Sequence, residues 1–101
     1  MPTTVQDSVT VAPHIYKVLF ENNRVRLLEV RMKPGDRSEM HSHPAYAIYP
    51  LSDAKATFTP QDGESVEVEL KAGETLWHEA ESHAVHNRGT TEARVILFEL
   101  K

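Results

Sequence analysis

The sequence predicts an all-β fold, an antiparallel sandwich or barrel of the jelly-roll type. Short segments rich in β-branched and aromatic residues recur about every ten residues, with turn residues between them. In Val66–Leu70, apolar residues alternate with glutamates, which indicates a strand with one buried and one solvent-facing side. No segment predicts a helix of useful length. A chain of 101 residues has apolar residues for one core, so we expect one domain.

The chain is expected to begin with an N-terminal arm, residues 1–13, followed by a single domain, residues 14–101. The arm residues are mostly small or polar and lack a sustained periodicity, so we expect an extended segment that is either mobile or paired to a neighbouring molecule. The first strand, Tyr16–Glu21, leads to Asn22 and Asn23, which tolerate the positive φ of a tight turn.

The second strand, Val25–Met32, runs into Lys33–Asp36, whose proline and glycine are typical of a turn. A further series of segments with the same character completes the chain and brings the total to eight strands, the number in a jelly roll. These expected strands are Ala45–Leu51, Lys55–Thr59, Val66–Leu70, Thr75–His78, His83–Asn87 and Ala93–Leu100.

Three histidines are the candidate metal ligands. His41 and His43 are two apart, and on a β-strand such residues project from the same face. His83 follows forty residues after His43. Neutral imidazole is a common ligand of divalent metals, and three such ligands leave coordination positions open for water or substrate. We therefore expect one divalent ion per chain, with iron, zinc, nickel and manganese as candidates.

Continued alternation would place positions 41, 43, 45, 47 and 49 on one face, although Pro44 is able to disturb that register. The small Ala45 and Ala47 would then leave a cavity beside the histidines. Tyr49, at the far end, is a candidate catalytic residue that donates a hydrogen bond to substrate, or else a buried tyrosine with a satisfied hydroxyl. His78 is the second candidate, either a base at the cavity mouth or an exposed strand residue.

Several other side chains are weaker candidates for a functional role. Glu39 shares strand parity with His41 and is either a fourth, acidic ligand or a solvated carboxylate. His14 and His86 are expected not to bind metal, because His14 follows the arm and His86 has the opposite parity to His83. Three arginines are candidate anchors for a carboxylate, and three aromatic residues are expected in the core. These are Arg26, Arg31 and Arg94, and Phe58, Trp77 and Phe98.

The histidines lie in two segments that resemble the two motifs of the cupin superfamily. The first cupin motif is G, five residues, H, one residue, H, three or four residues, E; here Gly35, His41 and His43 match it. The second motif ends in H, three residues, N, which His83 and Asn87 match. The resemblance covers nearly the whole chain. It implies a double-stranded β-helix in which His41, His43 and His83 bind metal.

The chain departs from the cupin pattern at two points. Positions 47 and 48, where the family's glutamate ligand belongs, hold Ala47 and Ile48. The second motif is one residue shorter between Gly73 and His83 and lacks its internal proline and glycine. Within the cupins, the segments His41–Tyr49 and 76–83 are similar to compact proteins labelled as β-alanine-degradation proteins.

A divalent ion held by three neutral imidazoles keeps its charge of +2, which favours anionic ligands, especially beside an apolar wall. Cupins with three histidines that resemble this pattern include thiol dioxygenases, which use iron(II). The same ligands support a lyase or isomerase in which the metal is a Lewis acid. We therefore expect an enzyme that acts on a small anionic metabolite. The alternative is a non-catalytic cupin that binds metal or a small ligand; it would need an output domain that a chain of this length lacks.

Composition sets the expected partners and location. A net charge of −4, a pI near 5.8 and the absence of a lysine and arginine run argue against nucleic-acid binding. No apolar stretch is long enough for a membrane span, and no signal peptide is recognisable, so we expect no membrane partner and a cytoplasmic protein. The chain has no cysteine. Open strand edges and the arm favour a homodimer.

Overall fold

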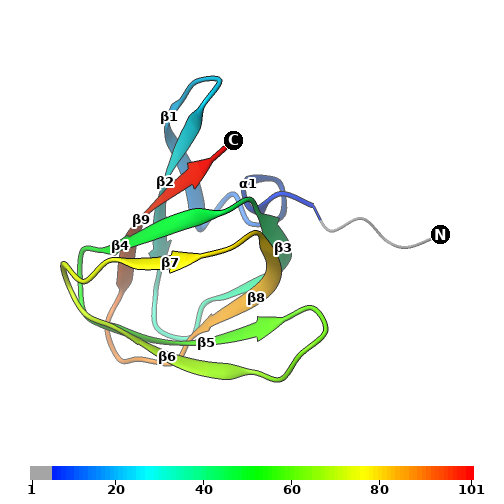
Figure 1. Ribbon diagram of the computed structural model, residues 1–101. Coiled ribbons are helices and arrows are strands. Elements are labelled where there is room, and N and C mark those ends of the chain that lie inside the picture. The colour runs from blue at the N-terminus through cyan, green and yellow to red at the C-terminus, as the bar shows by residue number, and fades with distance from the viewer. Residues whose placement is uncertain (1–5) are drawn as a thin grey trace.

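Two antiparallel β-sheets make up most of the computed structural model, which describes residues 6–101 (Figure 1). One sheet has the strand order β1-β2-β9-β4-β7 and the other the order β3-β8-β5-β6. The expected all-β jelly roll is confirmed. After the short helix α1 (Ser8–Val11), the strands are β1 (Tyr16–Glu21), β2 (Val25–Met32), β3 (Arg37–His43), β4 (Tyr46–Pro50), β5 (Ala54–Pro60), β6 (Val66–Leu70), β7 (Leu76–His78), β8 (Glu81–Asn87) and β9 (Ala93–Leu100).

The core lies between the two sheets. It is built from alternate residues along the strands, those whose side chains face inward, such as Leu28 on β2 and Leu97 on β9. Phe58 packs against this core as expected. Trp77 and Phe98 do not, since 51% and 42% of their surfaces are exposed, so the prediction that they belong to the core is wrong. Their strand neighbours face the core, and alternation therefore turns these two rings outward.

The segment before β1 is packed rather than loose over residues 6–13. Asp7 caps α1 by accepting a hydrogen bond from the Val9 amide at 3.3 Å, and Ser8 and Ala12 are buried. The Ser42 amide of β3 donates to the Gln6 carbonyl at 2.9 Å. The expected extended arm is therefore wrong for residues 6–13, because their apolar side chains cover the core; residues 1–5 lie outside the described part. In residues 6–101, no helix has the length and apolar character that crossing a membrane requires.

Residues 6–101 form nine strands rather than the expected eight, because the eight did not include β3, the strand that carries His41 and His43. The alternation expected to continue from these histidines to Tyr49 is interrupted, since β3 and β4 belong to different sheets. β3 ends at His43, and the chain crosses to the other sheet over Pro44 and Ala45, where proline has no N–H to donate to a ladder. The crossing shifts the parity by one residue. Tyr46 and Ile48 are buried, whereas 48% of Tyr49 is exposed, so the expected inward orientation of Ala47 and Tyr49 is wrong.

Candidate metal centre

The pairing of β3 with β8 brings the three histidines together. His41 lies directly opposite His83 in this register, and His43 projects from the same face of β3 two residues on. All three are at most 4% exposed. One ring nitrogen from each lies within 4.8 Å of the other two. The structure therefore assembles the three-histidine cluster that their spacing predicted.

Each imidazole is held through its Nδ1 atom by a different acceptor. Nδ1 of His41 donates to the Glu39 carbonyl at 2.7 Å. Nδ1 of His43 donates to Oε2 of Glu99 at 2.6 Å, and Nδ1 of His83 to Oε1 of Glu81 at 3.1 Å. A neutral imidazole that donates from Nδ1 keeps its lone pair on Nε2. Such outer hydrogen bonds orient metal-binding histidines, so this donor set fits one divalent ion.

Glu99 connects His43 to the N-terminal segment through a partly buried chain of charged side chains. Its side chain is 1% exposed, and its Oε1 accepts a hydrogen bond from Nε of Arg26 at 2.7 Å. Arg26 also donates to both carboxylate oxygens of Asp7, at 3.0 and 2.6 Å. Burial alone would raise the pKa of Asp7, but the hydrogen bond and charge of Arg26 lower it overall. The arrangement fixes the Glu99 carboxylate against His43.

Sequence reasoning missed Glu99, which is 56 residues from His43. A signal was present, because Glu99 continues the inward series of Ala93, Val95 and Leu97 on β9. A carboxylate at a core position needs partners. Such a break in an apolar series therefore marks a candidate site.

Glu81 forms a second connection, from His83 to the residues beside it. Its Oε1 accepts hydrogen bonds from Nδ1 of His83 and from the Tyr46 hydroxyl at 3.2 Å, and it lies 3.1 Å from Nδ1 of His78. The ring of His78 stacks on those of Tyr46 and Phe58, with centroids 5.4 and 6.1 Å away. His78 thus lies next to Glu81, which contacts the histidine cluster, and its catalytic role stays a prediction.

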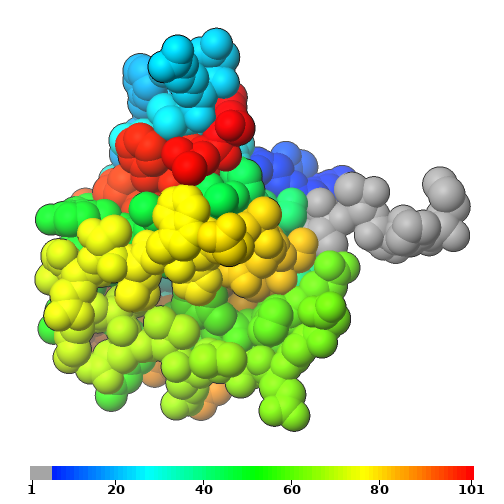
Figure 2. Space-filling model, viewed as in Figure 1, coloured from blue at the N-terminus to red at the C-terminus, as the bar shows by residue number. Residues whose placement is uncertain are grey.

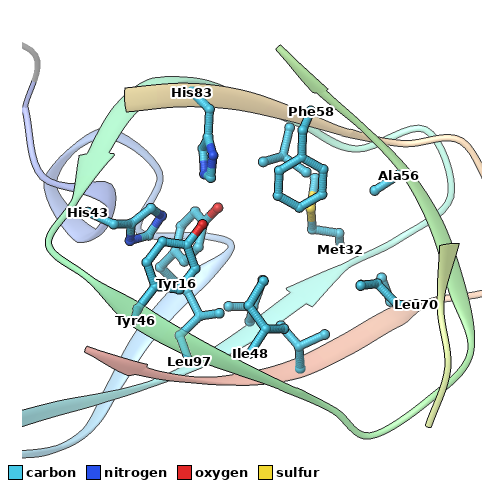
Figure 3. Close-up of a pocket in the computed structure, with 14 residues that line it drawn as sticks. Tyr16, Met32, His43, Tyr46, Ile48, Ala56, Phe58, Leu70, His83 and Leu97 are labelled. Carbon is cyan, nitrogen blue, oxygen red and sulfur yellow. The ribbon is translucent and has the colours of Figure 1, made fainter. Parts of the chain in front are cut away.

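Two tyrosine hydroxyls reach the space between the histidines (Figure 3). The Tyr16 hydroxyl is 3.1 Å from Nε2 of His41 and donates to it, because Nδ1 of that ring already donates to a carbonyl. Burial raises the pKa of Tyr16 and Tyr46 well above the usual value near 10, so both keep their protons at neutral pH. The sequence predicted Tyr49 rather than Tyr46 at the cavity, because the alternation of inward and outward residues was expected to continue unchanged past Pro44.

The cavity beside the histidines encloses about 40 Å³ and is mainly apolar (Figure 3). None of the described residues that line it is a lysine or arginine. Among the expected carboxylate anchors, Arg26 is bound to Asp7 and Glu99, Arg31 is exposed and Arg94 is on the outward parity of β9. The residues that define the cavity, apart from His43 and His83, are Tyr16, Val30, Met32, Tyr46, Ile48, Ala56, Phe58, Leu70, Val85, Ala93, Val95 and Leu97.

The other candidate ligands are outside the cluster. Glu39 is exposed, because a bulge between Ser38 and His41 shifts the alternation, so the expectation that it shares a face with His41 is wrong. Ile48, and not Ala47, faces the cavity at the position of the cupin glutamate. His14 is exposed and His86 has the outward parity of β8, as predicted for residues that do not bind metal.

The buried histidines predict a pH-dependent stability for the metal-free protein. Burial lowers the pKa of His41 from 6.5 to about 4 and, together with the neighbouring histidines, that of His83 to about 2. As the pH falls below 6.5, the unfolded chain takes up protons that the folded chain does not, so the free energy of unfolding decreases. The loss attributable to His41 should approach about 3 kcal/mol by pH 4.

Chemical denaturation at pH 7 and at pH 4.5 measures this loss. His41→Asn should reduce the difference in the free energy of unfolding between the two pH values. Replacement of the exposed His14 by asparagine should leave that difference unchanged. Equal stability of the unsubstituted protein at the two pH values would contradict the burial argument.

Comparisons with known proteins agree with this geometry. The family model described as "Cupin domain" matches residues 28–99. A crystal structure of a cupin domain from Bordetella pertussis is 25% identical, covers 99% of both chains and gives a TM-score of 0.79. An RmlC-like cupin with a double-stranded β-helix fold from Methanocaldococcus jannaschii is 12% identical over 85% of this chain and 78% of its own, with a TM-score of 0.68. No curated protein matches the sequence.

Proposed function

The chain belongs to the cupin domain family, and we propose that it is a mononuclear metal enzyme that acts on a small anionic molecule. One observation carries the proposal: His41, His43 and His83 each have Nδ1 engaged by an acceptor, and one ring nitrogen of each lies within 4.8 Å of the other two. An ion that displaces the Tyr16 hydroxyl from Nε2 of His41 would meet three imidazole ligands. Iron, zinc, nickel and manganese all accept imidazole ligands. A bound divalent ion supplies Lewis acidity, and bound iron also supplies redox chemistry.

The charges around the cluster support an anionic ligand. The cluster contributes no carboxylate ligand, and the nearby Glu99 carboxylate is paired with Arg26. Because the described residues of the cavity wall include no lysine or arginine, the metal position would be the main partner of a ligand's anionic group. The hydroxyls of Tyr16 and Tyr46 could join it only by leaving His41 and Glu81. A cavity of about 40 Å³ accepts only a few non-hydrogen atoms. The remainder of the ligand would contact apolar side chains.

His78 and Tyr46 favour catalysis over simple binding, since an imidazole can accept a proton and a phenol hydroxyl can donate a hydrogen bond beside the metal position. His78 is half-buried next to the cluster, and its ring is oriented by stacking on Tyr46 and Phe58, with Nδ1 3.1 Å from Oε1 of Glu81. We assign it the role of proton acceptor. Tyr49 is exposed on the outer face, so Tyr46 is the hydroxyl donor that we assign in its place. The alternative, a non-catalytic cupin that binds metal or a small ligand, is favoured by the small size of the cavity.

Metal content and turnover test the proposal. Protein purified without a histidine tag should contain about one divalent ion per chain by elemental analysis. The iron(II), zinc, nickel and manganese forms are then assayed with small thiol carboxylates and three-carbon amino acids, a set chosen because the sequence resembles cupins labelled as β-alanine-degradation proteins. Iron-dependent oxygen uptake, measured with an oxygen electrode, would assign a dioxygenase, since zinc cannot change its oxidation state.

Turnover by the zinc or nickel form without oxygen uptake would assign a lyase or isomerase. One bound ion with no turnover of any acid by any form would favour the non-catalytic alternative. A chain that binds none of the four metals would contradict the proposal.

A further inference from the structure

The N-terminal segment, residues 6–13, contacts β3 at the residue between two of the three histidines. The Ser42 amide donates to the Gln6 carbonyl at 2.9 Å, and the neighbouring Asp7 forms a parallel β-bridge with Ser42. Helix α1 lies beside β3, and the outer side of the segment, in blue, is at the surface of the molecule (Figures 1 and 2). The segment therefore connects the molecular surface to the strand that carries two of the candidate ligands.

The surrounding domain holds this segment in place. Helix α1 has four residues, too few for a stable isolated helix in water. Ser8 and Ala12 are buried and Val9 packs against the core, so tertiary contacts stabilise the segment. Segments of this kind open locally at a lower free energy than the whole domain unfolds. Each contact that holds the segment against the domain therefore changes its local stability.

Asp7 makes the contact that leads to a metal ligand. Both of its carboxylate oxygens accept hydrogen bonds from Arg26, and Nε of Arg26 donates to Glu99. Glu99 in turn accepts from Nδ1 of His43. The exposed fraction of the side chain falls from 37% for Asp7 through 14% for Arg26 to 1% for Glu99. Because guanidinium is a planar, rigid fork of donors, the carboxylate on one side of it also fixes its direction toward the carboxylate on the other side.

We propose that Asp7 is a positioning residue for the metal ligand His43 and acts on it through Arg26 and Glu99. The N-terminal segment then belongs to the metal site, although none of its residues 6–13 is in the histidine cluster. The inference rests on the metal site of the proposed function and not on catalysis. Because coupling between two binding events is reciprocal, metal binding should also hold the segment against the domain.

Zinc affinity, measured by competition with a chelator, tests the role of Asp7. Asp7→Asn keeps a side chain that caps a helix but loses the charge that pairs with Arg26. It should raise the zinc dissociation constant roughly three- to tenfold, less than the loss of a direct partner of a ligand. In a Glu99→Gln background the same substitution should have almost no effect, since the route to the histidine is already broken.

Glu21→Gln is the matched control. Glu21 lies opposite Arg26 in the pairing of β1 with β2, but it is exposed and pairs with Lys101, so the loss of its charge should leave zinc affinity unchanged. Unchanged zinc affinity in Asp7→Asn would overturn the proposal. So would an equal loss of affinity in both backgrounds, because Asp7 would then act on the ion by its charge alone.

Amide hydrogen exchange in the unsubstituted protein tests the reciprocal effect and requires no variant to fold. The amides of Thr10, Val11 and Ala12 donate hydrogen bonds within the segment, so their exchange reports on its opening. Saturating zinc should slow this exchange roughly three- to tenfold, as the reciprocal coupling requires. Unchanged exchange in the zinc-bound protein would overturn the proposal and leave the metal site itself intact. A chain that binds no zinc would also overturn it, and if none of the four candidate metals binds, the proposed function fails with it.

Discussion

Alanine in place of His41, His43 or His83 is expected to reduce the bound metal from about one ion per chain to a trace. Each substitution removes one of three converging nitrogens, and two imidazoles rarely hold a labile divalent ion in competition with buffer. Elemental analysis after dialysis measures the loss. Because these residues are buried, the circular dichroism spectrum of each variant should be recorded alongside.

His86→Ala is the matched control for His83→Ala. Both residues are on β8, three positions apart, but His86 has the outward parity. Its replacement should leave one ion per chain, as should replacement of the exposed His14. If His86→Ala removed as much metal as His83→Ala, the assignment of the three-histidine site would be wrong.

Loss of the buried Glu99 carboxylate should affect both metal affinity and stability. Glu99→Gln keeps the shape of the side chain but removes the negative charge between His43 and Arg26. Loss of such an orienting partner weakens metal binding roughly 10- to 100-fold. Glu99→Ala leaves the guanidinium and the imidazole without their common acceptor, which should lower the free energy of unfolding by about 3–5 kcal/mol. Competition with a chelator and denaturant titration measure the two effects.

Glu67→Gln provides the comparison for Glu99→Gln, since Glu67 is exposed on β6 and distant from the histidines in the sheet order. Glu67→Gln should change neither the metal affinity nor the free energy of unfolding measurably. Metal affinity in Glu99→Gln equal to that of the unsubstituted protein would show that the hydrogen bond to His43 does not orient this ligand.

Local sequence patterns were sufficient to predict eight of the nine strands in residues 6–101 and the pairing of His41 with His43. The alternation in Val66–Leu70 and the turn residues after Met32 depend on neighbouring positions, and the structure has strands at these places. The pairing of His41 with His43 followed from the two-residue period of a strand. His83 was included because its segment resembled the second cupin motif. These features depend on spacing along the chain.

Tertiary structure decided which residues surround the histidines. Pro44 and Ala45 carry the chain from one sheet to the other, which reverses the parity and brings Tyr46 inward in place of Tyr49. The partners of the histidines come from distant strands: Glu99 is 56 residues from His43, and Tyr16 is 25 residues from His41. Local periodicity fixes the face of a strand on which a side chain lies, but strand pairing and sheet packing determine which faces meet.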